Sequence, residues 1–94
     1  MEPQKKEMQI KVRDEELKGS YSNLMQIVHM REEFILDFFL SAPPQGMLAS
    51  RVIVSPGHAK RIAAAMAGAV KKYEEQFGPI KEGEAPEGQI GFVK

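Results

Sequence analysis

The chain has 94 residues, its 13 basic side chains balance 13 acidic ones, and it contains no cysteine. One domain is expected at this length, and zero net charge argues against strong non-specific binding to nucleic acid. Without cysteine there are no disulfides and no thiolate metal ligands, which fits a reducing compartment. The N-terminus lacks the apolar core of a signal peptide and no apolar run is long enough to span a membrane, so we expect a cytoplasmic protein.

Four segments in the first half of the chain predict strands. Residues 1–7 are polar and we expect them to be flexible, whereas residues 8–13, MQIKVR, alternate between apolar and polar side chains as a half-buried strand does. Residues 20–29 predict a second strand with apolar residues on both faces. The third runs from Phe34 to Leu40 and the fourth from Met47 to Val54, separated by SAPPQG, whose two prolines cannot continue a hydrogen-bonded ladder.

The strongest local signal is a helix directly after the fourth strand. Ser55 can cap its N-terminus, Pro56 suits the first helical position, and Gly78 with Pro79 ends it. One apolar stripe at helical spacing runs along it and comprises Ala59, Ile62, Ala63, Met66, Val70, Tyr73 and Phe77.

This order predicts an α+β domain over residues 8–78. Short connections favour a four-stranded antiparallel meander, and the single C-terminal helix packs on the sheet, giving the order ββββα. Residues 79–94 are rich in Gly, Pro and Glu and predict a disordered tail.

The third predicted strand is apolar on both faces, although a sheet with one covered face should be polar on the other. Its side chains divide into one set of Phe34, Leu36, Phe38 and Leu40 and another of Ile35, Asp37 and Phe39. Covering Ile35 and Phe39 would stabilise the protein by roughly 3–5 kcal/mol. We therefore expect a homodimer or higher oligomer, with an interface that includes Ile35, Asp37, Phe39, Met25 and Ile27.

Asp37 has two interpretations. In the first it is a catalytic or ligand-binding carboxylate whose pKa is raised by its apolar surroundings. In the second it forms an ion pair, either with Arg51 on the neighbouring strand or across a subunit interface. A one-residue slip in register changes which face a residue occupies, so the sequence leaves the partner open. The lack of a second catalytic residue favours the ion pair.

A basic patch near the helix N-terminus is a further candidate site, formed by Arg51, His58, Lys60 and Arg61. Backbone N–H groups at a helix N-terminus attract anions, so a phosphate or a nucleic-acid backbone could bind there. The alternative is an ordinary solvated helix face.

The sequence contains no recognisable enzyme signature and no set of metal ligands. His29 and His58 have no third ligand at a suitable spacing, and the nucleotide-binding, hydrolase and metalloprotease motifs are all missing. We therefore predict no catalytic residues, no metal and no cofactor.

Four motifs together resemble a small prokaryotic family known as domain of unknown function three-four-six-seven. They are YSN at 21–23, EFILDF at 33–38, SRVIVSPGHAKR at 50–61 and YEEQFGPI at 73–80. The resemblance spans about two thirds of the chain, implies a bacterial or archaeal origin, supports strands followed by a helix, and supplies no function. The order of elements is also loosely similar to that of the export chaperone SecB, which is an analogy of fold alone.

These observations favour a non-enzymatic, homo-oligomeric interaction module, either an adaptor or a chaperone-like subunit, that binds itself or another protein. The alternative is a protein that binds nucleic acid or phosphate through the basic patch. A third hypothesis, an enzyme centred on Asp37 or His58, would need a pocket with converging polar groups.

Overall fold

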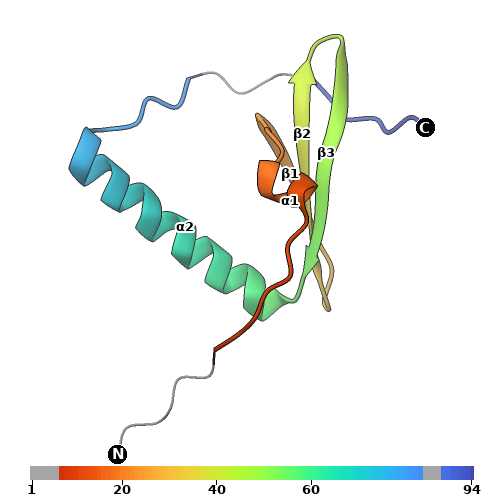
Figure 1. Cartoon of the computed structure of the whole chain (residues 1–94). Helices are drawn as coiled ribbons and strands as arrows, with labels where there is room; N and C mark the ends of the chain where they lie inside the picture. The colour runs from red at the N-terminus through yellow and green to blue at the C-terminus, as the bar shows by residue number, and fades with distance from the viewer. Residues whose placement is uncertain (1–6, 84–87) are drawn as a thin grey trace, which may run out of the picture.

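The computed structural model describes residues 7–83 and 88–94, which contain a three-stranded sheet and two helices (Figure 1). The elements are α1 (Asp14–Lys18), β1 (Leu24–His29), β2 (Phe34–Ala42), β3 (Gln45–Val54) and α2 (Pro56–Phe77). Both strand pairs are antiparallel and the order in the sheet is β1-β2-β3. The α+β class and the antiparallel meander agree with the prediction. Most of the segment predicted to be flexible, residues 1–6, and part of the predicted tail, residues 84–87, lie outside the described residues.

The two strand connections are tight. Between β1 and β2, the backbone N–H of Met30 donates to the carbonyl of Glu33 at 2.9 Å. Between β2 and β3 only Pro43 and Pro44 lie outside the strands, so the break is shorter than the six residues predicted. The two prolines occupy the two turn positions, where no ladder hydrogen bond is required of them.

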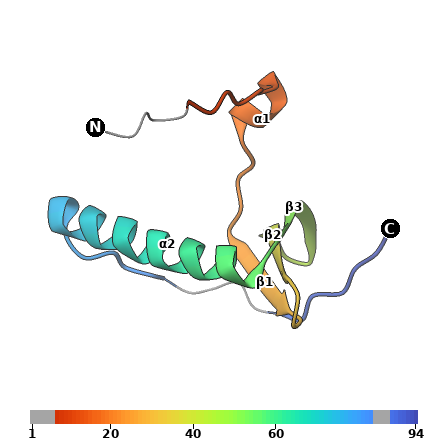
Figure 2. The same ribbon diagram turned by 90° about the horizontal axis from the view of Figure 1, so that it is seen from below.

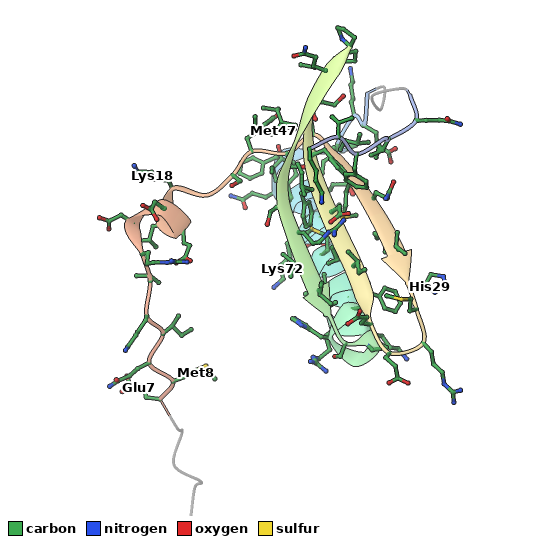
Figure 3. The ribbon with its side chains drawn as sticks, turned by 90° about the vertical axis from the view of Figure 1, so that its right-hand side faces the viewer. Glu7, Met8, Lys18, His29, Met47 and Lys72 are labelled. Atoms are coloured by element: carbon green, nitrogen blue, oxygen red, sulfur yellow. The ribbon has the colours of Figure 1, made fainter. Side chains whose placement is uncertain are left out.

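The predicted strand over residues 8–13 is absent from the described part of the chain, and the four-stranded prediction is corrected to three strands. Residues 8–13 have no strand structure and lead into α1, which lies away from the sheet (Figure 3). The alternating apolar side chains Met8, Ile10 and Val12 are 81%, 73% and 57% exposed. Alternation predicts a strand only where a neighbouring strand supplies hydrogen bonds, and no described segment of this chain does so here.

Helix α2 has the predicted ends but not the predicted packing. The Oγ of Ser55 accepts a hydrogen bond from the backbone N–H of His58 at 3.2 Å, and Gly78 follows the helix with φ 94°. No residue of α2 is buried, and only Ala59 and Ile62 in its apolar stripe are partly covered. Because Ser55 alone joins it to β3, the helix starts beside the sheet and then runs away from it (Figures 1 and 2).

The buried core of the chain is correspondingly small. Among the described residues, Leu36, Phe39 and Val54 are the buried apolar side chains. The accessible surface is 9500 Å², whereas a compact monomer of this mass would expose roughly 5,400 Å². The radius of gyration is 17.1 Å, against about 12 Å for a compact domain of this length. Most of the large apolar side chains in the described part of the chain are therefore exposed in one copy.

We predict that Ser55→Ala lowers the free energy of unfolding by about 1 kcal/mol, because it removes the side chain that satisfies an N–H at the start of α2. Urea denaturation followed by circular dichroism measures the change. Ser20→Ala is the matched control, since Ser20 is exposed and lies outside every element. Equal stability of the two variants would contradict the capping role.

Candidate functional site

Strand register divides the predicted interface residues between the two faces of the sheet. Directly opposite residues of an antiparallel pair share a face. Met25 lies opposite Phe38 and Ile27 opposite Leu36, on the face that we call the helix-side face because α2 begins over it. The other face, which we call the tail-side face, carries Ile35, Asp37 and Phe39, together with Arg51 and Leu48 from β3. The five residues predicted as one interface thus belong to two surfaces.

Asp37 and Arg51 form a bidentate ion pair at the middle of the tail-side face. They lie directly opposite each other in the β2–β3 register. The Nε of Arg51 donates to Oδ1 of Asp37 at 2.7 Å, and Nη2 donates to Oδ2 at 2.8 Å. The carboxylate side chain is only 2% exposed, whereas that of Arg51 is 47% exposed. Of the two partners that the sequence left open, the structure shows the one within the chain.

This pairing decides the ionisation of Asp37. The hydrogen bonds from the Arg51 guanidinium hold the pKa of the carboxyl below its ordinary value of 3.8, although burial acts in the opposite direction. Asp37 is therefore ionised and fully engaged near neutral pH. A general acid or base needs a pKa near the working pH, so the geometry favours a structural role over a catalytic one.

The described C-terminal residues 88–94 lie against the tail-side face. The ring centroid of Phe92 is 6.0 Å from that of Phe39, and Cζ of Arg51 is 5.7 Å from the centre of the Phe92 ring. A groove of about 420 Å³ lies here, lined by the β2–β3 hairpin, Leu24 and residues 88–93. Part of the second apolar face is thus covered by the chain's own C-terminal segment.

A larger groove, of about 910 Å³, lies between the helix-side face and the first half of α2. Its sheet wall comprises Met25, Ile27, Phe34, Leu36 and Phe38, and its helix wall comprises Ala59, Ile62, Ala63 and Met66. Met66 is 62% exposed and Ile27 is 50% exposed. The walls are therefore apolar but are not in contact with each other along most of their length.

The residues of the predicted basic patch belong to two elements, β3 and the first turns of α2. Arg51 belongs to the tail-side face and its guanidinium is bound to Asp37. The backbone of His58 donates to Ser55, while Lys60 and Arg61 are exposed in the first turns of α2. One of the four residues of the predicted patch is thus already engaged with a carboxylate.

Within residues 7–83 and 88–94, no three acidic or histidine side chains gather as a metal site. Neither described helix is long and apolar enough to cross a membrane.

Ser22 and Asn23 have a role that sequence reasoning missed. The amide of Asn23 donates to the carbonyl of Ser41 at 3.0 Å and accepts from its N–H at 2.8 Å. The Oγ of Ser22 lies 3.0 Å from the carbonyl oxygen of Phe39, to which it donates. Both side chains continue the β1–β2 pairing beyond Leu24. The available signal was the residue type, since Ser and Asn readily bond to backbone groups at strand ends.

The Asp37–Arg51 pair predicts the behaviour of single and double variants. We expect Arg51→Met to lower the melting temperature by several degrees, because the remaining carboxylate, whose side chain is only 2% exposed, lacks its cation. The double variant Asp37→Leu/Arg51→Met should recover part of this loss, since apolar residues can replace a buried ion pair. A double variant less stable than Arg51→Met would contradict the pairing.

The lowered pKa of Asp37 also predicts a pH dependence. A carboxyl whose native pKa lies below its unfolded value stabilises the fold above the unfolded pKa, and this contribution is lost as pH falls through the native pKa. We therefore expect the free energy of unfolding to decline below about pH 4, and to decline less steeply in the double variant. Urea titrations from pH 6 downwards measure the slopes. Arg13 lowers the pKa of Glu16 in the same direction, so Glu16→Gln in both backgrounds is the control. Identical slopes for the wild type and double variant would refute the assignment.

Comparison with known proteins identifies the family. The model of the family described as "Protein of unknown function (DUF3467)" matches residues 1–82. No curated protein and no solved structure matches the chain. The matched range includes the sheet, the Asp37–Arg51 pair and α2, and it stops before the segment that carries Phe92.

Proposed function

This chain belongs to the DUF3467 family of proteins of unknown function, and we propose that it is a non-enzymatic interaction module that assembles with copies of itself. The observation that carries the proposal is the open apolar groove between the sheet and α2. Apolar surface of this extent, left in water, usually marks an interface.

The surface area supports a second copy as the occupant. A stable interface needs about 800 Å² from each partner. The chain exposes 9500 Å², roughly 4,000 Å² more than a compact monomer of its mass. The exposed apolar side chains that border the groove or continue from it along α2 include Met25, Ile27, Met66, Val70, Tyr73 and Phe77.

The apolar stripe of α2 is complementary to the groove in chemistry. Met66, Val70, Tyr73 and Phe77 extend from the groove along the helix and are all exposed. In a two-fold dimer the same surfaces meet in both directions, so the stripe of each helix would fill the groove of the other copy. A pair of amphipathic helices would then be covered by two sheets.

The state of the polar side chains supports a non-enzymatic role. The buried acid is ionised and paired with Arg51. The walls of the large groove are formed mainly by Met, Ile, Leu, Phe and Ala side chains. Such a surface offers shape and apolar area to a partner, which is what association requires.

We predict that Met66→Glu raises the dissociation constant of the oligomer at least about 100-fold, because each of two copies would bury a charge in an apolar groove. Sedimentation velocity over a range of protein concentrations measures this. Ala64→Glu is the matched control, since it introduces the same side chain about 160° around the helix. A wild-type chain that sediments as a monomer at tens of micromolar, or equal weakening by both variants, would contradict the proposed interface.

We propose further that residues 8–13 form a fourth strand only in the oligomer, by pairing with a free sheet edge of a second copy. Their alternation suits a strand and their apolar side chains lack cover in one chain. The outer edges of β1 and β3 have no neighbour among the described residues.

Hydrogen exchange tests this pairing. We predict that the backbone amides of residues 8–13 are protected in the wild-type oligomer and exchange freely in the Met66→Glu variant, because their hydrogen-bond partners belong to another copy. The amides of β2 are the internal control, since both of its neighbours lie within the chain. Free exchange at residues 8–13 in the assembled wild type would contradict the proposal.

A further inference from the structure

The large groove between the sheet and α2 has a methionine on each wall. Met25 of β1 lines the sheet wall, and Met66 of α2 lines the helix wall. Their side chains are 46% and 62% exposed in the single chain. A flexible thioether adapts its shape to an incoming apolar surface, so both residues suit the self-assembly proposed above.

Methionine carries all of the sulfur in this chain. The sequence has six methionines, no cysteine and no tryptophan. Peroxides oxidise thioethers to sulfoxides, and this chain has no thiol that would react first. Exposed methionines are therefore the sulfur groups through which an oxidant can change the protein.

The remaining described methionines lie elsewhere on the molecule. Met8, Met30 and Met47 are 81%, 49% and 70% exposed, and they do not line the large groove. Met47 lies near the start of β3 (Figure 3). An oxidant therefore reaches methionines inside and outside the groove alike, and those outside serve as internal references.

The reaction with hydrogen peroxide is a transfer of one oxygen atom. A lone pair of the methionine Sδ attacks one peroxide oxygen, so that an S–O bond forms as the O–O bond breaks. The proton of the transferred oxygen passes to the departing hydroxide, which leaves as water. The sulfur is oxidised by two electrons and the peroxide is reduced by the same two.

A sulfoxide is poorly suited to the closed groove. Its oxygen is a polar acceptor, whereas the walls are formed mainly by aliphatic and aromatic side chains. Among the polar lining residues, Ser22 and Asn23 already donate to backbone carbonyls of β2. Closing a second copy over the groove would therefore bury an S=O group without a donor, which is unfavourable.

We propose that Met25 and Met66 form an oxidation switch for the assembly of this protein. Their sulfoxides hold the chain in its unassembled form, and reductases that act on methionine sulfoxide return it to the form that assembles. This inference rests on the proposed self-assembly through the groove. Peroxide oxidises the unassembled chain, in which both thioethers are exposed, whereas assembly covers them, so the two processes compete for the same side chains.

Sedimentation velocity of the full-length chain before and after treatment with hydrogen peroxide tests the switch, and mass spectrometry quantifies the sulfoxide at each methionine. We expect oxidation to raise the dissociation constant at least about tenfold, because the S=O groups lose water without gaining donors. Met25→Leu/Met66→Leu should assemble as the wild type does, since leucine and methionine have similar volumes, and should keep its dissociation constant after treatment. Met30→Leu/Met47→Leu is the matched control and should remain as sensitive as the wild type.

A second measurement uses the wild type alone. The oxidation rate of Met66 relative to that of Met47 should fall several-fold as the protein concentration is raised through the dissociation constant, because assembly covers only Met66. A ratio that does not change with concentration would overturn the proposal. Equal dissociation of the wild type and of Met25→Leu/Met66→Leu after oxidation would overturn it as well.

The outcomes separate this inference from the proposed function. An untreated wild type that sediments as a monomer overturns both, whereas a chain that assembles equally well before and after oxidation of Met25 and Met66 overturns the switch alone. Treatment with the two methionine sulfoxide reductases, one for each epimer, and a thiol reductant should restore the original dissociation constant. Persistent dissociation after complete reduction would show irreversible damage and contradict a switch.

Discussion

The bidentate bond between Arg51 and Asp37 is the constraint on which both surfaces of the sheet depend. A slip of one residue between β2 and β3 would place the carboxylate and its cation on opposite faces, so the pair stabilises one register strongly. That register places Val52 and Val54 of β3 opposite Leu36 and Phe34 on the helix-side face. It also orients the guanidinium that Phe92 contacts on the other. One ion pair thus fixes which β2 and β3 residues share each face of the sheet.

The single chain is a sheet with a helical arm and little shared core. A helix can bury its apolar stripe by packing on a sheet, but here α2 leaves β3 through Ser55 and diverges (Figure 1). The consequence is that the two faces of the sheet differ in what covers them. The helix-side face borders the open groove of about 910 Å³, whose lining is mainly apolar. The tail-side face contains the Asp37–Arg51 ion pair and is in contact with the C-terminal segment that carries Phe92.

Sequence reasoning predicted the elements whose signals are local. The ends of α2 followed from Ser55 and Gly78, and the central strand followed from the apolar run at Phe34–Leu40, because capping and β-propensity act within a few residues. Features that depend on segments distant in the chain could not be predicted from the sequence. The alternation of residues 8–13 cannot report whether a neighbouring strand exists. The partner of Asp37 depends on the β2–β3 register, which shifts by one residue between Phe38 and Phe39. The contact of Phe92 with Phe39 of β2 joins positions more than 50 residues apart. No periodic pattern in the sequence predicts such a contact.

The small core has a consequence for how the protein is maintained in a cell. Under the proposed assembly, folding is completed only when two chains meet, so the fraction of properly closed chains depends on how many are present. Chains made in excess of their partners, or diluted below the dissociation constant, would keep the apolar walls of the groove exposed. Such chains are preferred substrates for proteases and chaperones. Because α2 diverges from the sheet, the survival of a chain would depend on its concentration. Below the dissociation constant most chains would be degraded, and above it most would persist as oligomers.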